Sequence, residues 1–156
     1  MTGSQLVYLI IFNGVLAIAT IVLAAATVYL SLTTRGMVKQ ARKSSQGTII
    51  LQANKDFFFD DRLYKVRKAI ESKDKVLVSN GGKCTDQDVE DYIGYLETLY
   101  SFIDAGILDL EIVDDSFGAY AQEAYSNKEI HEYIMTLRRE NANDELYGGL
   151  EKWAKS

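Results

Sequence analysis

The chain has 156 residues, of which 47% are hydrophobic, and it carries a formal net charge of -5. This length suffices for one membrane segment and one small folded domain, and two globular domains would not fit comfortably. The acidic balance argues against a general nucleic-acid binder, because phosphate contacts need a clustered basic face and the acidic residues here are spread along the carboxyl-terminal part.

The chain begins with a short segment, residues 1–5, followed by an apolar stretch, residues 6–32, that contains no charged side chain. A helix of this length exceeds the roughly 20 residues that cross the hydrocarbon layer, so the stretch predicts one transmembrane helix. A cleaved signal peptide is the alternative, because Ala24, Ala25 and Ala26 resemble a cleavage site. No Lys or Arg precedes the stretch and apolar residues continue past the alanines, so we favour the membrane anchor.

Basic residues follow the apolar stretch within residues 33–48, a segment that we interpret as a juxtamembrane connector continuing the helix in part. They are Arg35, Lys39, Arg42 and Lys43. By the positive-inside rule, these cations place the carboxyl-terminal part in the cytoplasm and the amino terminus outside. Their side chains are expected to contact anionic lipid head groups.

Small or polar residues recur through the apolar stretch at alternating steps of four and three. They are Asn13, Ala17, Thr20, Ala24, Thr27 and Ser31. This spacing places all of them on one stripe of the helix, where small side chains allow a second helix to approach and polar ones can hydrogen-bond to it. The alternative is that Ala and Thr are simply common in membrane helices and that Asn13 reaches water. Two partners for the stripe stay open, a second copy of the chain and another membrane protein.

Apolar residues at helical spacing predict a cytoplasmic helical domain over residues 49–156. The expected helices, in chain order, are one over 48–71, one that follows an N-cap at Thr85 and ends before Gly106, one from Asp109 or Leu110, one after Asn127 and a short last one from Asp144. Residues 72–84, with Gly81 and Gly82, are expected to interrupt the helices. The predicted fold class is all-α, with one amino-terminal transmembrane helix followed by a small helical bundle.

Aromatic residues supply the candidates for a docking surface on this domain. The run Phe57, Phe58 and Phe59 points in three directions on a helix, so at least one ring belongs to the core and the others are candidate contacts. Ten tyrosines, Tyr95 and Tyr147 among them, combine apolar area with a polar tip, as residues at protein contacts do. The alternative is that the tyrosines fill the margins of the core.

No catalytic or metal-binding constellation can be assembled from the sequence. His131 lies beside Glu132 but lacks the second histidine of an HExxH zinc motif, so a surface position is expected. Cys84, the only cysteine, has no neighbouring base that would make it a nucleophile. We therefore expect no enzyme activity, no cofactor and no metal.

Two segments give the chain a family resemblance. At "YLETLYSFIDAGILDLEIVDD" and at "EYIMTLRRE" it resembles a prokaryotic family, domain of unknown function 4760. The resemblance implies a single amino-terminal span, a basic connector and a small helical domain whose long helix ends in a Gly-Ile-Leu-Asp step. It implies a place in the plasma membrane of a prokaryote. No catalytic residue is carried over from the family.

Two functions fit these expectations. The first is a noncatalytic accessory or scaffolding subunit, whose span packs on other helices and whose cytoplasmic domain docks on a partner. The second is a membrane-anchored sensor or effector, which oligomerises through its span when the domain binds a small ligand or signal. The second needs a ligand pocket, for which the basic candidates are Lys65, Arg67, Lys68, Arg138 and Arg139.

Overall fold

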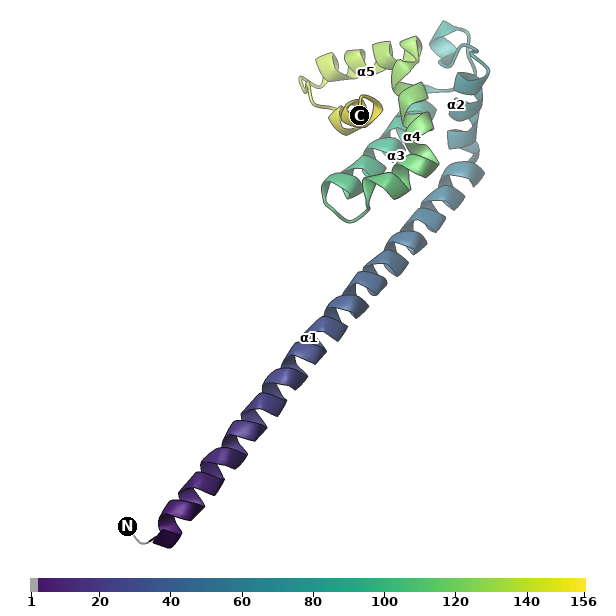
Figure 1. The fold of residues 1–156 in the computed structure, drawn as a ribbon. Coiled ribbons are helices and arrows are strands. Elements are labelled where there is room, and N and C mark those ends of the chain that lie inside the picture. The colour runs from purple at the N-terminus through teal and green to yellow at the C-terminus, as the bar shows by residue number, and fades with distance from the viewer. Residues whose placement is uncertain (1–2) are drawn as a thin grey trace. The chain divides into compact units, whose positions relative to one another are not determined.

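A computed structural model describes the backbone of residues 3–156, shown in Figure 1, and all side chains from residue 16 onward. Within this part the chain has six α-helices and one short 3-10 helix, and the only pairing of β type is an isolated bridge between Leu77 and Cys84. The chain divides into two compact units, Met1–Ser45 and Gln46–Ser156. The all-α fold class is confirmed.

The first unit is helical from Gly3 onward and belongs to helix α1, which spans Gly3–Phe59. Its side chains from Leu16 to Ser45 are exposed, and the helix is long and apolar enough to cross a membrane, with a mean hydropathy of 2.1 in its most apolar window. Residues 33–48, predicted to continue the helix only in part, are helical throughout.

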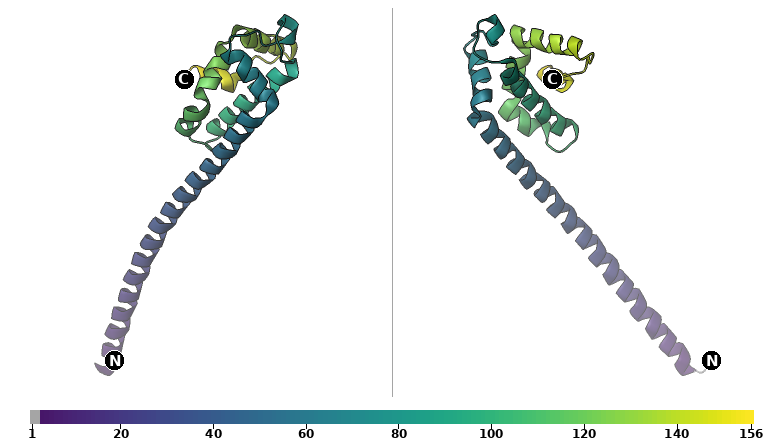
Figure 2. Two further views of the ribbon diagram at one scale, coloured as in Figure 1. Left: turned by 90° about the vertical axis from the view of Figure 1, so that its right-hand side faces the viewer. Right: turned by 180° about the vertical axis from the view of Figure 1, so that it is seen from behind.

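The second unit contains the last turns of α1 and all later elements. They are α2 (Asp61–Glu71), η1 (Val78–Asn80), α3 (Asp86–Asp104), α4 (Leu110–Ser126), α5 (Lys128–Glu140) and α6 (Gly148–Ala154). Helix α3 packs against α2, α4 and α6, and α4 packs against α5 and α6 (Figure 2). The large side chains buried among these helices include Phe57, Tyr92, Phe117 and Trp153.

The prediction of one helix over residues 48–71 is wrong, because the helix is interrupted at Asp60. This residue is extended, with φ -77° and ψ 120°, and its carboxylate accepts hydrogen bonds from the backbone N–H groups of Arg62 and Leu63 at 2.8 and 3.3 Å. These are N-cap bonds, which satisfy donors that a new helix start leaves free. Asp60 therefore ends α1 and begins α2.

Helix α3 begins and ends where the sequence predicts. Thr85 and Asp88 form a reciprocal capping box, in which each side chain accepts a hydrogen bond from the other residue's backbone N–H. At the other end, Gly106 adopts φ +67°, a left-handed conformation that glycine reaches without a steric penalty. The expected start of one helix at Asp109 or Leu110 and of another after Asn127 is confirmed as well, since α4 begins at Leu110 and α5 at Lys128.

The last helix begins at Gly148 and not at Asp144, as the sequence suggested. Tyr147 precedes it in a left-handed conformation, with φ 57°. The carboxylate of Glu97 on α3 accepts hydrogen bonds from the backbone N–H groups of Gly149 and Leu150, at 3.0 and 2.6 Å. The start of α6 is thus stabilised by a residue about fifty positions away in the sequence, in place of a local N-cap.

Candidate functional site

The predicted packing stripe lies on the exposed surface of α1. Ala17, Thr20, Ala24, Thr27 and Ser31 are all exposed, and the side chain of Asn13 lies outside the described residues. The hydroxyls of Thr20 and Thr27 each donate to the carbonyl four residues earlier, at 2.8 Å. These two hydroxyls can therefore only accept a hydrogen bond from a facing helix. The predicted head-group residues are also exposed on α1: Arg35, Lys39, Arg42 and Lys43.

The Phe57–Phe59 run, predicted as part of the docking surface, divides between core and surface. Phe57 is fully buried, with the rings of Phe117 and Tyr120 centred 5.3 and 5.1 Å from its own. It cannot contact a partner, so its assignment as a docking residue is wrong. Phe58 is 37% exposed and Phe59 is 82% exposed, so both remain available at the surface.

An apolar groove of about 350 Å³ runs between the end of α1 and α3 in the second unit. Its walls are formed by Thr48, Ile49, Gln52, Ala53 and Asp56 on α1 and by Tyr95, Thr98, Leu99 and Phe102 on α3. The hydroxyl of Tyr95 donates to the carbonyl of Ala53 at 2.8 Å, and burial raises the pKa of Tyr95 to about 12. Tyr95, a predicted docking residue, therefore stays neutral and fixes the spacing of the two walls.

The groove continues into a smaller, acidic depression of about 280 Å³ that shares Asp56, Tyr95 and Thr98 with it. Asp60 and Asp91 also line this depression. Arg62, the one basic residue in its lining, lies 3.4 Å from the Asp60 carboxylate and 2.6 Å from that of Asp91. Three carboxylates against one guanidinium leave this end of the groove negatively charged.

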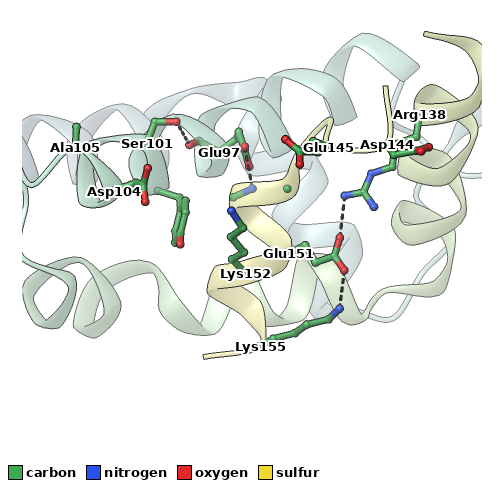
Figure 3. Close-up of a pocket in the computed structure, with 13 residues that line it drawn as sticks. Glu97, Ser101, Asp104, Ala105, Arg138, Asp144, Glu145, Glu151, Lys152 and Lys155 are labelled. Carbon is green, nitrogen blue, oxygen red and sulfur yellow. Dashed lines mark hydrogen bonds and ion pairs between the residues drawn. The ribbon is translucent and has the colours of Figure 1, made fainter. Parts of the chain in front are cut away.

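A polar cavity of about 570 Å³ lies between α3, the end of α5 and α6 (Figure 3). Three of its charged groups form an ion-pair network, and a fourth binds the backbone. The Glu151 carboxylate lies between the Arg138 guanidinium, at 2.9 Å, and the Lys155 ammonium, at 2.6 Å, while Glu97 holds the start of α6. Because these bonds join the three elements, we interpret the cavity as structural. Tyr147, the other predicted docking tyrosine, is half-buried against the core.

Acid is expected to weaken the second unit through Glu151. Hydrogen bonds from Lys155 and Arg138 lower the pKa of Glu151 from 4.5 to about 2. Because the pKa is depressed in the folded chain, the stabilisation is complete above about pH 4.5 and is lost as the pH falls towards 2. The free energies of unfolding of wild type and Glu151→Gln, measured by urea unfolding, should approach each other as the pH is lowered from about 4.5 towards 2. Glu132→Gln, at a 66% exposed residue, is the control and should leave the pH profile unchanged.

A further cavity, of about 430 Å³, lies between α2 and the loop that leads to α3, and we call it the lysine cavity. Its lysines are Lys65, Lys68, Lys75 and Lys83. The sequence suggested only the first two as ligand groups, since Lys75 and Lys83 are brought beside them by the folding of the loop. The other basic candidates lie elsewhere: Arg67 is buried among aromatic rings, Arg138 is paired with Glu151, and Arg139 donates to the Met135 carbonyl.

The single cysteine is buried in the core, and the single histidine packs on a tyrosine ring. Cys84 is fully buried, and burial raises the pKa of its thiol, which disfavours the reactive thiolate. The ring of His131 lies edge-on to that of Tyr125, with centroids 5.0 Å apart. Among the described residues, no three His, Cys, Asp or Glu side chains are grouped so as to hold a metal ion.

Comparison with known proteins assigns the chain to a family but gives no activity. No curated protein and no solved structure matches it significantly. Residues 14–156, which include most of the span and the whole helical domain, match the family described as domain of unknown function (DUF4760). The family resemblance predicted from the sequence is thereby confirmed, and the chain belongs to the DUF4760 family.

Proposed function

We propose that this chain is a noncatalytic, membrane-anchored accessory or scaffolding subunit. Helix α1 anchors it in a prokaryotic plasma membrane with the amino terminus outside, and the exposed stripe from Ala17 to Ser31 packs against other membrane helices. The second unit lies in the cytoplasm and docks on a partner. The orientation is supported by the basic residues that follow the apolar stretch, because such residues are retained on the cytoplasmic side.

The apolar groove with its acidic end is the observation that carries the proposal. We assign to it the basic, amphipathic juxtamembrane segment of another membrane protein. An amphipathic helix binds by laying its apolar face into such a groove. Cytoplasmic segments next to a membrane span are rich in Lys and Arg, so their charge complements Asp56, Asp60 and Asp91.

Thr98→Lys is expected to weaken partner binding by about tenfold or more, because it places a cation and a long side chain in the wall of the groove. Thr136→Lys is a matched control. Both threonines are exposed on helices, and each hydroxyl donates to the carbonyl four residues earlier, Gly94 for Thr98 and Glu132 for Thr136. The tagged full-length chain would be purified in mild detergent, and bound proteins would be identified by mass spectrometry and native mass.

An unlike membrane protein in fixed ratio, lost in Thr98→Lys and kept in Thr136→Lys, would support the proposal. Equal recovery of that partner with both variants would show that the groove is not the docking site. A homo-oligomer without an unlike partner would contradict the subunit role and favour the second candidate function, a membrane-anchored sensor or effector. The lysine cavity is the specific observation that favours a sensor, because a sensor needs a ligand site.

A further inference from the structure

The lysine cavity concentrates positive charge on an otherwise acidic unit. Residues 46–156 contain thirteen Lys and Arg against twenty-two Asp and Glu, yet four lysines and a single acidic residue, Asp74, line this cavity. Within the described part of the chain, no carboxylate lies within 4.0 Å of any of the four lysine ammonium groups. Like charges that line one cavity repel one another, and the carboxylates that interact electrostatically with them from outside its lining include Asp88 with Lys65 and Glu129 with Lys75.

The loop that carries two of these lysines is held in place from both sides. On one side, the Glu129 carboxylate of α5 accepts hydrogen bonds from the backbone N–H groups of Val76 and Leu77, at 2.8 and 2.9 Å, and from the Asn80 amide, at 2.7 Å. Burial alone would raise the pKa of Glu129, but these bonds lower it, so the anchor stays ionised at neutral pH.

On the other side, the two arms of the loop are joined by backbone hydrogen bonds. The Val76 carbonyl accepts from the N–H groups of Lys83 and Cys84 at 3.1 and 2.9 Å, and the Leu77 carbonyl accepts from Gly82 at 2.8 Å. Lys75 and Lys83 are therefore attached to a fixed backbone next to helix α2, which supplies Lys65 and Lys68. The four lysine side chains are exposed, but the backbone that carries them is in place before any ligand arrives, which lowers the entropy lost on binding.

We propose that the lysine cavity binds a small anion that carries two or more phosphate groups. Lysine ammonium groups bind phosphate as point charges, and four of them around one cavity suit a ligand that holds several negative charges in a small volume. After Asp74 is counted, an excess of three positive charges matches a diphosphate or triphosphate. Tyr64, which is 47% exposed, and Ala69 add an apolar wall for an organic group attached to the phosphates.

The test is calorimetric titration of the full-length chain in a nonionic detergent with three probes: pyrophosphate, ATP and dihexanoylphosphatidylglycerol. The first two represent free phosphate compounds and the third a lipid head group. Lys65→Gln with Lys83→Gln removes two charges from the cavity, and Lys55→Gln with Lys128→Gln removes two charges outside it, all four lysines being exposed. We expect the cavity variant to bind its ligand about tenfold or more weakly, and the control variant to bind within about twofold of wild type.

Lys65→Arg with Lys83→Arg keeps both charges and should retain most of the affinity. If the two lysines acted only through the packing of their stems, the Arg and Gln variants would not differ according to their charge. Binding of pyrophosphate or ATP that needs the cavity lysines would support a free phosphate compound as the ligand. The same dependence for the lipid probe alone would contradict the proposal, because this probe carries a single phosphate group. No binding of any probe, or equal weakening in the cavity and control variants, would overturn the proposal. Thermal unfolding of each variant verifies its fold.

Discussion

Phe57→Ala is expected to lower the free energy of unfolding of the second unit by about 3–5 kcal/mol, the usual cost of removing a buried aromatic ring. The ring is completely buried, and it contacts aromatic residues from two other helices, Tyr92 and Tyr95 on α3 and Phe117 on α4, at centroid distances of 5.6, 5.7 and 5.3 Å. The guanidinium of the buried Arg67 lies 5.4 Å from the same ring centre. Its loss would therefore leave a cavity between α1, α3 and α4 and remove one wall around a buried cation.

The neighbouring phenylalanines are matched controls, because the three rings differ in burial and not in chemistry. Phe59→Ala, at an 82% exposed residue, should change the free energy of unfolding by less than about 0.5 kcal/mol. Phe58→Ala should fall between the two, since Phe58 is 37% exposed and packs on Arg67 at 4.6 Å. Urea unfolding followed by the fluorescence of Trp153, the only tryptophan, measures all three. Equal effects of the three substitutions would contradict the placement of Phe57 in the core.

Local signals were sufficient where a helix is bounded by its own residues. Helix α3 combines regular apolar spacing with a capping box at Thr85 and Asp88 and a left-handed glycine at Gly106. All three signals lie within or next to the helix, so the sequence predicts both ends. The helix break at Asp60 also depends on local bonds, but the sequence did not predict it. Asp60 and Asp61 follow each other in a helical pattern, and both carboxylates fit the exposed face of one continuous helix equally well.

Long-range contacts account for what the sequence could not predict. The start of α6 depends on Glu97, which lies on α3, and nothing near Gly148 in the sequence indicates it. The lysine cavity shows the same limit. Lys65 and Lys68 are three residues apart on one helix and are recognisable as a pair, whereas Lys75 and Lys83 join them only because Glu129 and the backbone bonds fold the loop back. The apolar groove likewise depends on the pairing of α1 with α3, which periodicity alone does not determine.

Gly82→Ala is expected to destabilise the second unit by about 1–3 kcal/mol, because a methyl group at this position collides with the backbone carbonyl oxygens of Lys75 and Val76. Because these are backbone atoms, they cannot move aside as the end of a flexible side chain could. The two arms of the loop would have to separate, which would strain the hydrogen bonds that Val76 accepts from Lys83 and Cys84. Gly82→Ala should therefore also weaken anion binding, since Lys75 and Lys83 lie on the two arms.

Gly94→Ala separates this collision from a general effect of replacing glycine by alanine. Gly94 lies in α3, and a methyl group there meets no atom within 4 Å, so the change should stabilise the unit by about 0.5–1 kcal/mol through helix propensity. Cys84, fully buried and next to the loop arm, reports the local opening. Its thiol should react with a disulfide reagent about tenfold faster or more in Gly82→Ala and at the wild-type rate in Gly94→Ala. If the loop tolerated the methyl group, the two variants would react alike, and the tight apposition of its arms would be disproved.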